Sequence, residues 1–157
     1  MALKGVKRIS RIINEFLKPF ECTARMGTDF CYLYHKNLIF YSIVWMNNGA
    51  EDFLNSVLRL EPEVEADVFL WSLLHEVGHH ETYDEISDEE NDYCDDTKKK
   101  IEEGELPNEL YYDMIDERLA TEWAVEYANT HKEELKAFWE KLQPAIMDFY
   151  RLNKVEV

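Results

Sequence analysis

The segment 68–80 holds residues whose types and spacing could bind a metal ion. It includes His75-Glu76-Val-Gly78-His79, and at about 100° per residue the two histidines fall on one helical face, one turn apart. Two imidazoles in this arrangement can share one Zn²⁺, while Glu76 faces the side where a metal-bound water would lie. Gly78 removes a side chain beside this face, so another backbone could come close. The alternative is a buried helix whose histidines make ordinary hydrogen bonds.

A zinc site of the catalytic type needs a third protein ligand and leaves one position for water. On the helix predicted over 108–128, Glu117 falls within an apolar face at helical spacing. The residues adjoining it on that face are Ala120, Trp123, Ala124, Tyr127 and Ala128. A carboxylate in a buried stripe is unfavourable unless it is paired or binds a metal, which makes Glu117 the candidate. The alternative is that Glu117 lies at the edge of the stripe and reaches water.

Other polar residues could support these ligands. Asp113 lies one turn before Glu117 on the same face, as an alternative ligand or as the acceptor for the free N–H of a ligating histidine. His80 lies about 100° round the helix from His79, which favours a supporting role over a ligand role. An additional donor to a developing oxyanion could be His80 or one of four tyrosines, between which the sequence does not choose: Tyr83, Tyr111, Tyr112 and Tyr127.

Together the two motifs, His75-Glu76-Val-Gly78-His79 and Glu117-Arg-Leu-Ala-Thr-Glu-Trp-Ala, resemble those of the ImmA/IrrE-type metallopeptidases of phages, mobile elements and bacteria. That family carries His-Glu-x-Gly-His and, on a later helix, Glu-x-x-Ala-x-x-Phe-Ala. The resemblance implies that His75, His79 and Glu117 bind the metal, as in gluzincins, and that Glu76 is the catalytic base. It also implies a zincin-like α+β fold, mostly helical, with a small antiparallel sheet near the active-site helix.

The chemistry expected from these residues is zinc-dependent hydrolysis of peptide bonds in a protein substrate. Zn²⁺ lowers the pKa of its bound water toward about 7, and Glu76 would accept the proton as that water attacks the scissile carbonyl. Two other functions remain open. A zinc-containing protein that binds a partner without cleaving it would carry the same motif, and an acidic decoy could occupy the basic site of a DNA-binding protein.

Composition narrows the class of protein. A chain of 157 residues with 46% hydrophobic and 13% aromatic residues predicts a single folded domain over 1–157. The formal net charge of −16 disfavours direct binding to nucleic acid or membranes, and favours a basic regulator as a partner besides the substrate. Three cysteines without a Cys-x-x-Cys pair, and an N-terminus without a signal-peptide pattern, predict a cytoplasmic protein.

The remaining elements must position the two motifs. Helices are predicted over about 4–20, 50–59, 62–80, 108–128 and 131–142, with a last helix opened by Pro144. Aromatic and branched residues at 30–34 and 38–45 predict an antiparallel hairpin, with His35 exposed in or beside its turn. The acidic stretch at about 81–106 is expected to be a mobile, solvated connection, and it lacks the pattern of an EF-hand calcium loop.

Overall fold

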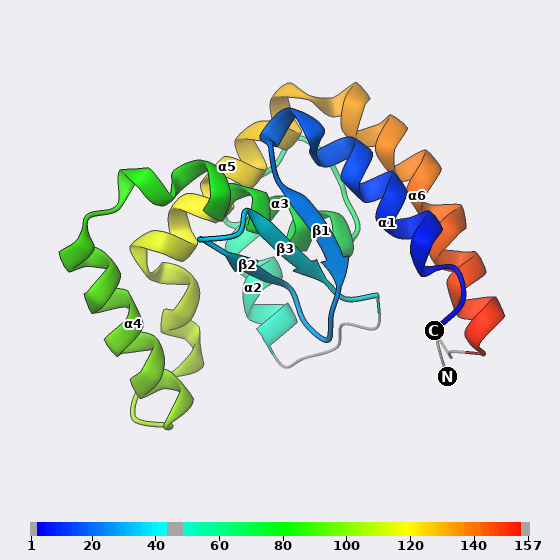
Figure 1. Cartoon of the computed structure of the whole chain (residues 1–157). Helices are drawn as coiled ribbons and strands as arrows, with labels where there is room; N and C mark the ends of the chain where they lie inside the picture. The colour runs from blue at the N-terminus through cyan, green and yellow to red at the C-terminus, as the bar shows by residue number, and fades with distance from the viewer. Residues whose placement is uncertain (1–2, 44–48, 155–157) are drawn as a thin grey trace. The chain divides into compact units, whose positions relative to one another are not determined.

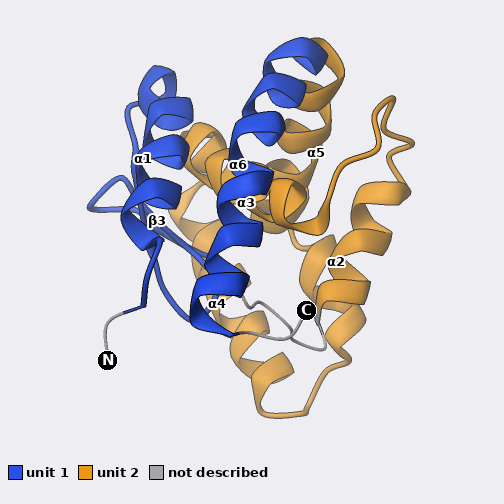
Figure 2. Ribbon diagram, turned by 90° about the vertical axis from the view of Figure 1, so that its right-hand side faces the viewer, with its two compact units in different colours: residues 1–45, 131–157 blue, residues 46–130 orange. Residues whose placement is uncertain are grey.

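A computed structural model describes residues 3–43 and 49–154 of the chain. In these residues the fold is mostly helical with one small sheet, which confirms the predicted α+β class (Figure 1). The chain divides into two compact units (Figure 2): unit 1 is residues 1–45 and 131–157, and unit 2 is residues 46–130. A single domain over 1–157 stays a prediction. No helix of the described ranges is long and apolar enough to cross a membrane.

Three short strands form the sheet of unit 1, in the order β1-β3-β2: β1 (Thr23–Met26), β2 (Cys31–Leu33) and β3 (Leu38–Tyr41). β2 and β3 are antiparallel, which confirms the predicted hairpin, and His35 is exposed between them. The predicted end of the second strand falls in residues 44–48, outside the described residues. β1 pairs in parallel with β3, so the sheet is mixed, and the prediction of a purely antiparallel sheet is wrong.

The four residues of β1 are too few to show an alternating pattern, so the sequence does not predict this strand. A contact from helix α1 (Val6–Leu17) holds it in place. The Asn14 side chain accepts the backbone N–H of Ala24 at 2.7 Å and donates to its carbonyl at 3.1 Å, as a neighbouring strand would. α1 is followed by the 3₁₀ helix η1 (Lys18–Phe20), which agrees with the helix predicted over 4–20.

α1 packs against helix α6 (Lys132–Asn153), and the two run in opposite directions (Figure 1). Phe16, near the end of α1, stacks on Phe138, near the start of α6, with 4.1 Å between ring centroids. At the other end of the pair, the Arg8 guanidinium lies 2.7 Å from the Asp148 carboxylate. Apolar contacts and an ion pair therefore fix this helix pair.

α6 is one continuous helix, and the predicted break between a helix over 131–142 and a last helix from Pro144 is wrong. Pro144 lies inside the helix, where the missing N–H and the ring clash cost roughly 3 kcal/mol. The apolar stripe of α6 continues across the proline, and its burial outweighs that cost. The buried stripe comprises Leu135, Phe138, Leu142, Ala145, Ile146 and Phe149.

In unit 2, helices α3 (Val68–Thr82) and α5 (Ile115–Thr130) pack against each other. The predicted start of α3 at residue 62 is wrong. Asp67 caps the helix by accepting the backbone N–H of Phe69 at 2.8 Å, and the apolar run begins directly after it. The preceding residues, rich in glutamate, offer no apolar face through which packing could stabilise a helix.

The other elements of unit 2 are α2 (Gly49–Leu58), η2 (Tyr83–Glu85), α4 (Asp88–Glu102) and η3 (Asn108–Asp113). α2 confirms the helix predicted over 50–59. The helix predicted over 108–128 is divided, because Met114 has an extended backbone with ψ 148° between η3 and α5. The buried Met114 side chain packs with Cys94 and Ile101 of α4.

Most of the stretch predicted to be a mobile connection, 81–106, forms helix α4, so that prediction is wrong. Ser87 and Glu90 form a capping box at its start, in which each side chain accepts the backbone N–H of the other residue. Acidic residues in the first turn and lysines in the last turn suit the helix dipole. The two buried residues of α4, Cys94 and Ile101, make one narrow stripe, which the many charges conceal in the sequence.

Replacing Asn14 by alanine should lower the free energy of unfolding by about 1–3 kcal/mol, because both polar backbone groups of Ala24 lose their partner. Denaturant titration of the variant would measure this loss. Glu15→Ala, an exposed neighbour on α1, is the matched control and should change stability much less. Equal effects of the two substitutions would show that Asn14 does not hold β1.

Candidate metal centre

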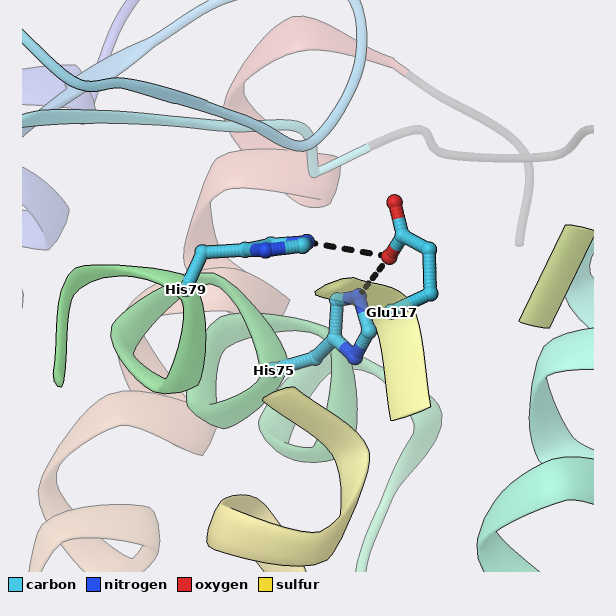
Figure 3. A group of neighbouring side chains, drawn as sticks. All are labelled: His75, His79 and Glu117. Atoms are coloured by element: carbon cyan, nitrogen blue, oxygen red, sulfur yellow. Dashed lines mark hydrogen bonds and ion pairs between the residues drawn. The ribbon is translucent and has the colours of Figure 1, made fainter. Parts of the chain in front are cut away.

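Two side chains from α3 and one from α5 converge in unit 2 (Figure 3). One carboxylate oxygen of Glu117, Oε2, lies 2.6 Å from Nε2 of His75 and 2.9 Å from Nε2 of His79. One possible ligand atom from each residue lies within 4.8 Å of the others, and all three residues are buried. This group could therefore hold a metal ion.

The close approach of α3 and α5 at Gly78 brings the group together. A Cβ atom on Gly78 would lie only 2.3 Å from the backbone carbonyl oxygen of Ala120, so only glycine fits there. Ala120, Ala124 and Ala128 are fully buried and keep the facing side of α5 small. The predicted close approach of another backbone at Gly78 is confirmed. Because Glu117 precedes Ala120 by about one turn, it reaches the two imidazoles.

The hydrogen bonds of Thr121, a residue of α5, determine which ring nitrogen of His75 carries the hydrogen and which one has a free lone pair. The Thr121 hydroxyl donates to the Glu117 carbonyl at 3.0 Å, so its oxygen is left to accept from Nδ1–H of His75, also at 3.0 Å. In neutral His75 the lone pair of Nε2 is then directed at Oε2 of Glu117. Two lone pairs 2.6 Å apart repel unless a cation, a proton or a metal ion, lies between them.

The donor set fits a divalent metal. Two imidazole nitrogens and one glutamate oxygen are the protein ligands of one common class of catalytic zinc site. Ligand atoms about 2.0–2.2 Å from a tetrahedral ion lie roughly 3.3 Å apart. The distances of 2.6 and 2.9 Å between Glu117 and the histidines would need to grow by less than about 1 Å.

The second oxygen of Glu117 has a different partner. Oε1 lies 3.0 Å from Nζ of Lys98, a residue of α4, and Nζ also lies 2.5 Å from Oδ2 of Asp116. Asp116 is buried, and its other oxygen accepts the backbone N–H of Glu117 at 2.8 Å.

Burial alone would raise the pKa of Glu117, but the two imidazoles hold it well below its usual range. Burial would lower the pKa of Lys98, but the neighbouring carboxylates and Tyr111 raise it. Both groups are therefore charged.

Aromatic rings line the histidine side of the group. The His75 ring packs edge-on against Phe53 of α2, at 5.2 Å between centroids, and against Tyr112 of η3, at 6.1 Å. The Tyr111 ring lies 5.1 Å from Nζ of Lys98, and burial together with the Glu117 charge raises the pKa of its phenol. Of the four tyrosines considered as oxyanion donors, Tyr111 and Tyr112 thus lie beside the group.

The structure leaves two predicted supporting residues outside the group. The exposed Asp113 lies 3.4 Å from Arg59, so it is not the acceptor predicted for a histidine N–H, and Thr121 takes that place for His75. Tyr127 follows Glu117 by ten residues, which places it about 15 Å further along α5.

Tyr127 stacks on Trp123 with 5.2 Å between ring centroids, and therefore cannot donate to an oxyanion at the metal group. Tyr83 is 39% exposed and begins η2, after the end of α3. His80 is half-buried on α3. Glu76, the predicted base, is buried on α3 directly after His75.

Three residues of the centre are not among the site residues that the sequence predicts: Lys98, Asp116 and Thr121. Lys98 carries a usable signal, because it lies four residues after Cys94 and three before Ile101, on the one apolar stripe of α4. Thr121 lies four residues after Glu117 on the same face of α5. Only the contact between elements distant in sequence shows the function of either residue.

Comparisons of the chain with protein families, curated proteins and solved structures found no match.

Replacing Gly78 by alanine should push α5 away from α3, because the new Cβ would meet a backbone oxygen that cannot rotate away. Overpacking of this kind costs about 1–3 kcal/mol of stability, and the displaced Glu117 should also weaken zinc binding. Thermal unfolding and zinc titration would measure both effects. Glu81→Ala, at an exposed position of α3, should leave zinc affinity unchanged. Normal zinc affinity in Gly78→Ala would contradict the role of this contact.

Proposed function

We propose that the protein is a zinc-dependent metallopeptidase of the ImmA/IrrE type, with a zincin-like fold, that hydrolyses peptide bonds of a protein substrate. The convergence of His75, His79 and Glu117 on one point carries the proposal. Two imidazoles on one helix and a glutamate from a second helix are the ligand arrangement that the sequence resemblance implies. The nitrogen-rich donor set favours zinc over magnesium or calcium, which prefer oxygen ligands.

In this proposal His75, His79 and Glu117 hold the metal, which supplies Lewis acidity toward water and the scissile carbonyl when it is bound. Glu76 accepts the proton of the attacking water and passes it to the leaving amine. Glu76 directly follows His75 on α3, so the base and the two histidine ligands belong to one helix.

A zinc-containing protein that binds a partner without cleaving it is the second candidate. The burial of the metal group favours it, since His75, His79 and Glu117 are exposed by only 4%, 7% and 3%. A peptidase must admit a polypeptide to its metal, so in the first candidate the centre has to open for the substrate. The two candidates differ in what they require of Glu76: hydrolysis needs its carboxylate as a base, and partner binding does not.

Substituting Glu76→Gln should therefore separate them. Zinc-loaded wild-type protein and the variant would be incubated with a proteome-derived peptide library, and new N-termini counted by mass spectrometry. We expect the variant to keep one zinc per chain and to lose cleavage by a factor of about 10²–10⁴, because a proton acceptor is removed without a change of shape.

Glu81→Gln, an exposed glutamate of the same helix, is the matched control and should cleave like the wild type. Equal cleavage by Glu76→Gln and the wild type would overturn the assigned base. A wild-type protein that binds zinc but cleaves none of the peptides would favour the second candidate.

A further inference from the structure

Lys98 lies on the inward face of α4, between the buried residues Cys94 and Ile101. Its side chain is only 20% exposed, whereas the adjacent Lys99 and Lys100 are exposed. A lysine ammonium group is rarely so far from water unless carboxylates compensate its charge. Here the compensation comes from α5, through Asp116 and Glu117. The low exposure of Lys98 therefore indicates a specific contact with these two carboxylates and not a role in solubility.

The Glu117 carboxylate is divided between two kinds of partner. Oε2 faces the two histidines at 2.6 and 2.9 Å, and Oε1 lies 3.0 Å from Nζ of Lys98. A free carboxylate can bind a metal through one oxygen or through both. With Oε1 bound to the ammonium group, only Oε2 remains for the metal. The number of protein ligand atoms is then three, as a site with an open position requires.

We propose that Lys98 is a positioning residue of the metal centre, which restricts Glu117 to coordination through a single oxygen. This inference rests on the metal binding included in the proposed function, and it is independent of peptide hydrolysis. Lys98 also balances charge: Asp116 and Glu117 are adjacent buried carboxylates, and one ammonium group neutralises one of them. The remaining negative charge lies at the histidines, where a metal cation would be bound.

The acidic stretch at about 81–106 then has a function at the metal centre. α4 delivers Lys98 to the centre, and the packing of Cys94 and Ile101 against Met114 fixes the helix against the start of α5. The Tyr111 ring, 5.1 Å from Nζ, stabilises the ammonium group from a further side. The carboxylates of α4 are largely exposed, whereas Lys98 reaches the two buried carboxylates of α5.

Cobalt(II) tests this directly, because the intensity of its visible absorption falls when the coordination number rises above four. The wild type, Lys98→Met, Lys98→Arg and Lys99→Met would be titrated with Co²⁺ alone. We expect one Co²⁺ per chain with intense visible bands for the wild type and for Lys99→Met, the exposed control. Lys98→Met should lose intensity as Oε1 joins the ligands, and Lys98→Arg should restore it, since a guanidinium group can still hold Oε1.

Visible bands of Lys98→Met that superimpose on those of the wild type would overturn the inference. If Lys98→Met does not fold, the double variant Lys98→Met/Asp116→Asn removes the paired charges together and decides in its place: weakened bands support the inference, and unchanged bands overturn it. A wild-type protein that binds no Co²⁺ overturns the metal centre as a whole. If the visible bands of the Co²⁺-loaded variants change as expected but the zinc-loaded protein cleaves no peptide, only the proposed hydrolysis is refuted. The role of Lys98 then stands.

Discussion

The contact between the backbones of α3 and α5 at Gly78 and Ala120 is the constraint on which the centre depends. Packed helices usually lie 8–10 Å apart, at a distance set by the side chains in the contact. Here the contact consists of a glycine and alanines, so the helices come close enough for Glu117 to reach two histidines on the other helix. A larger residue at this crossing would separate the ligands while leaving each helix intact.

The close contact of α3 and α5 also buries charged side chains, and their charges balance one another. Hydrogen bonds link two adjacent carboxylates, one ammonium group and two imidazoles into one network, with Glu117 between Lys98 and the histidines. Isolated buried charges are unfavourable by several kcal/mol, so each must face a partner. Thr121 contributes by fixing the His75 tautomer, which leaves a nitrogen lone pair opposite a carboxylate oxygen. A cation is the natural occupant between them.

Local periodicity explains which parts of the site could be predicted from the sequence. Helix geometry within a single element places His75 and His79 on one face of α3, with Gly78 beside them. It likewise places Glu117 on the apolar face of α5. Contacts between elements could not be read in this way. Lys98 lies in a charged stretch whose helix has only two buried residues, so its inward position has little signal in the sequence. Pro144 is typical of a helix start, but a long buried stripe stabilises α6 on both sides of it. β1 depends on Asn14 of another element.

Diffraction from crystals of the zinc-loaded protein, with anomalous data at the zinc edge, tests the central claim most directly. We expect one zinc ion per chain at about 2.0–2.2 Å from Nε2 of His75, Nε2 of His79 and Oε2 of Glu117. Zinc bound elsewhere on the chain, or bound by the two histidines with Glu117 turned away, would contradict it.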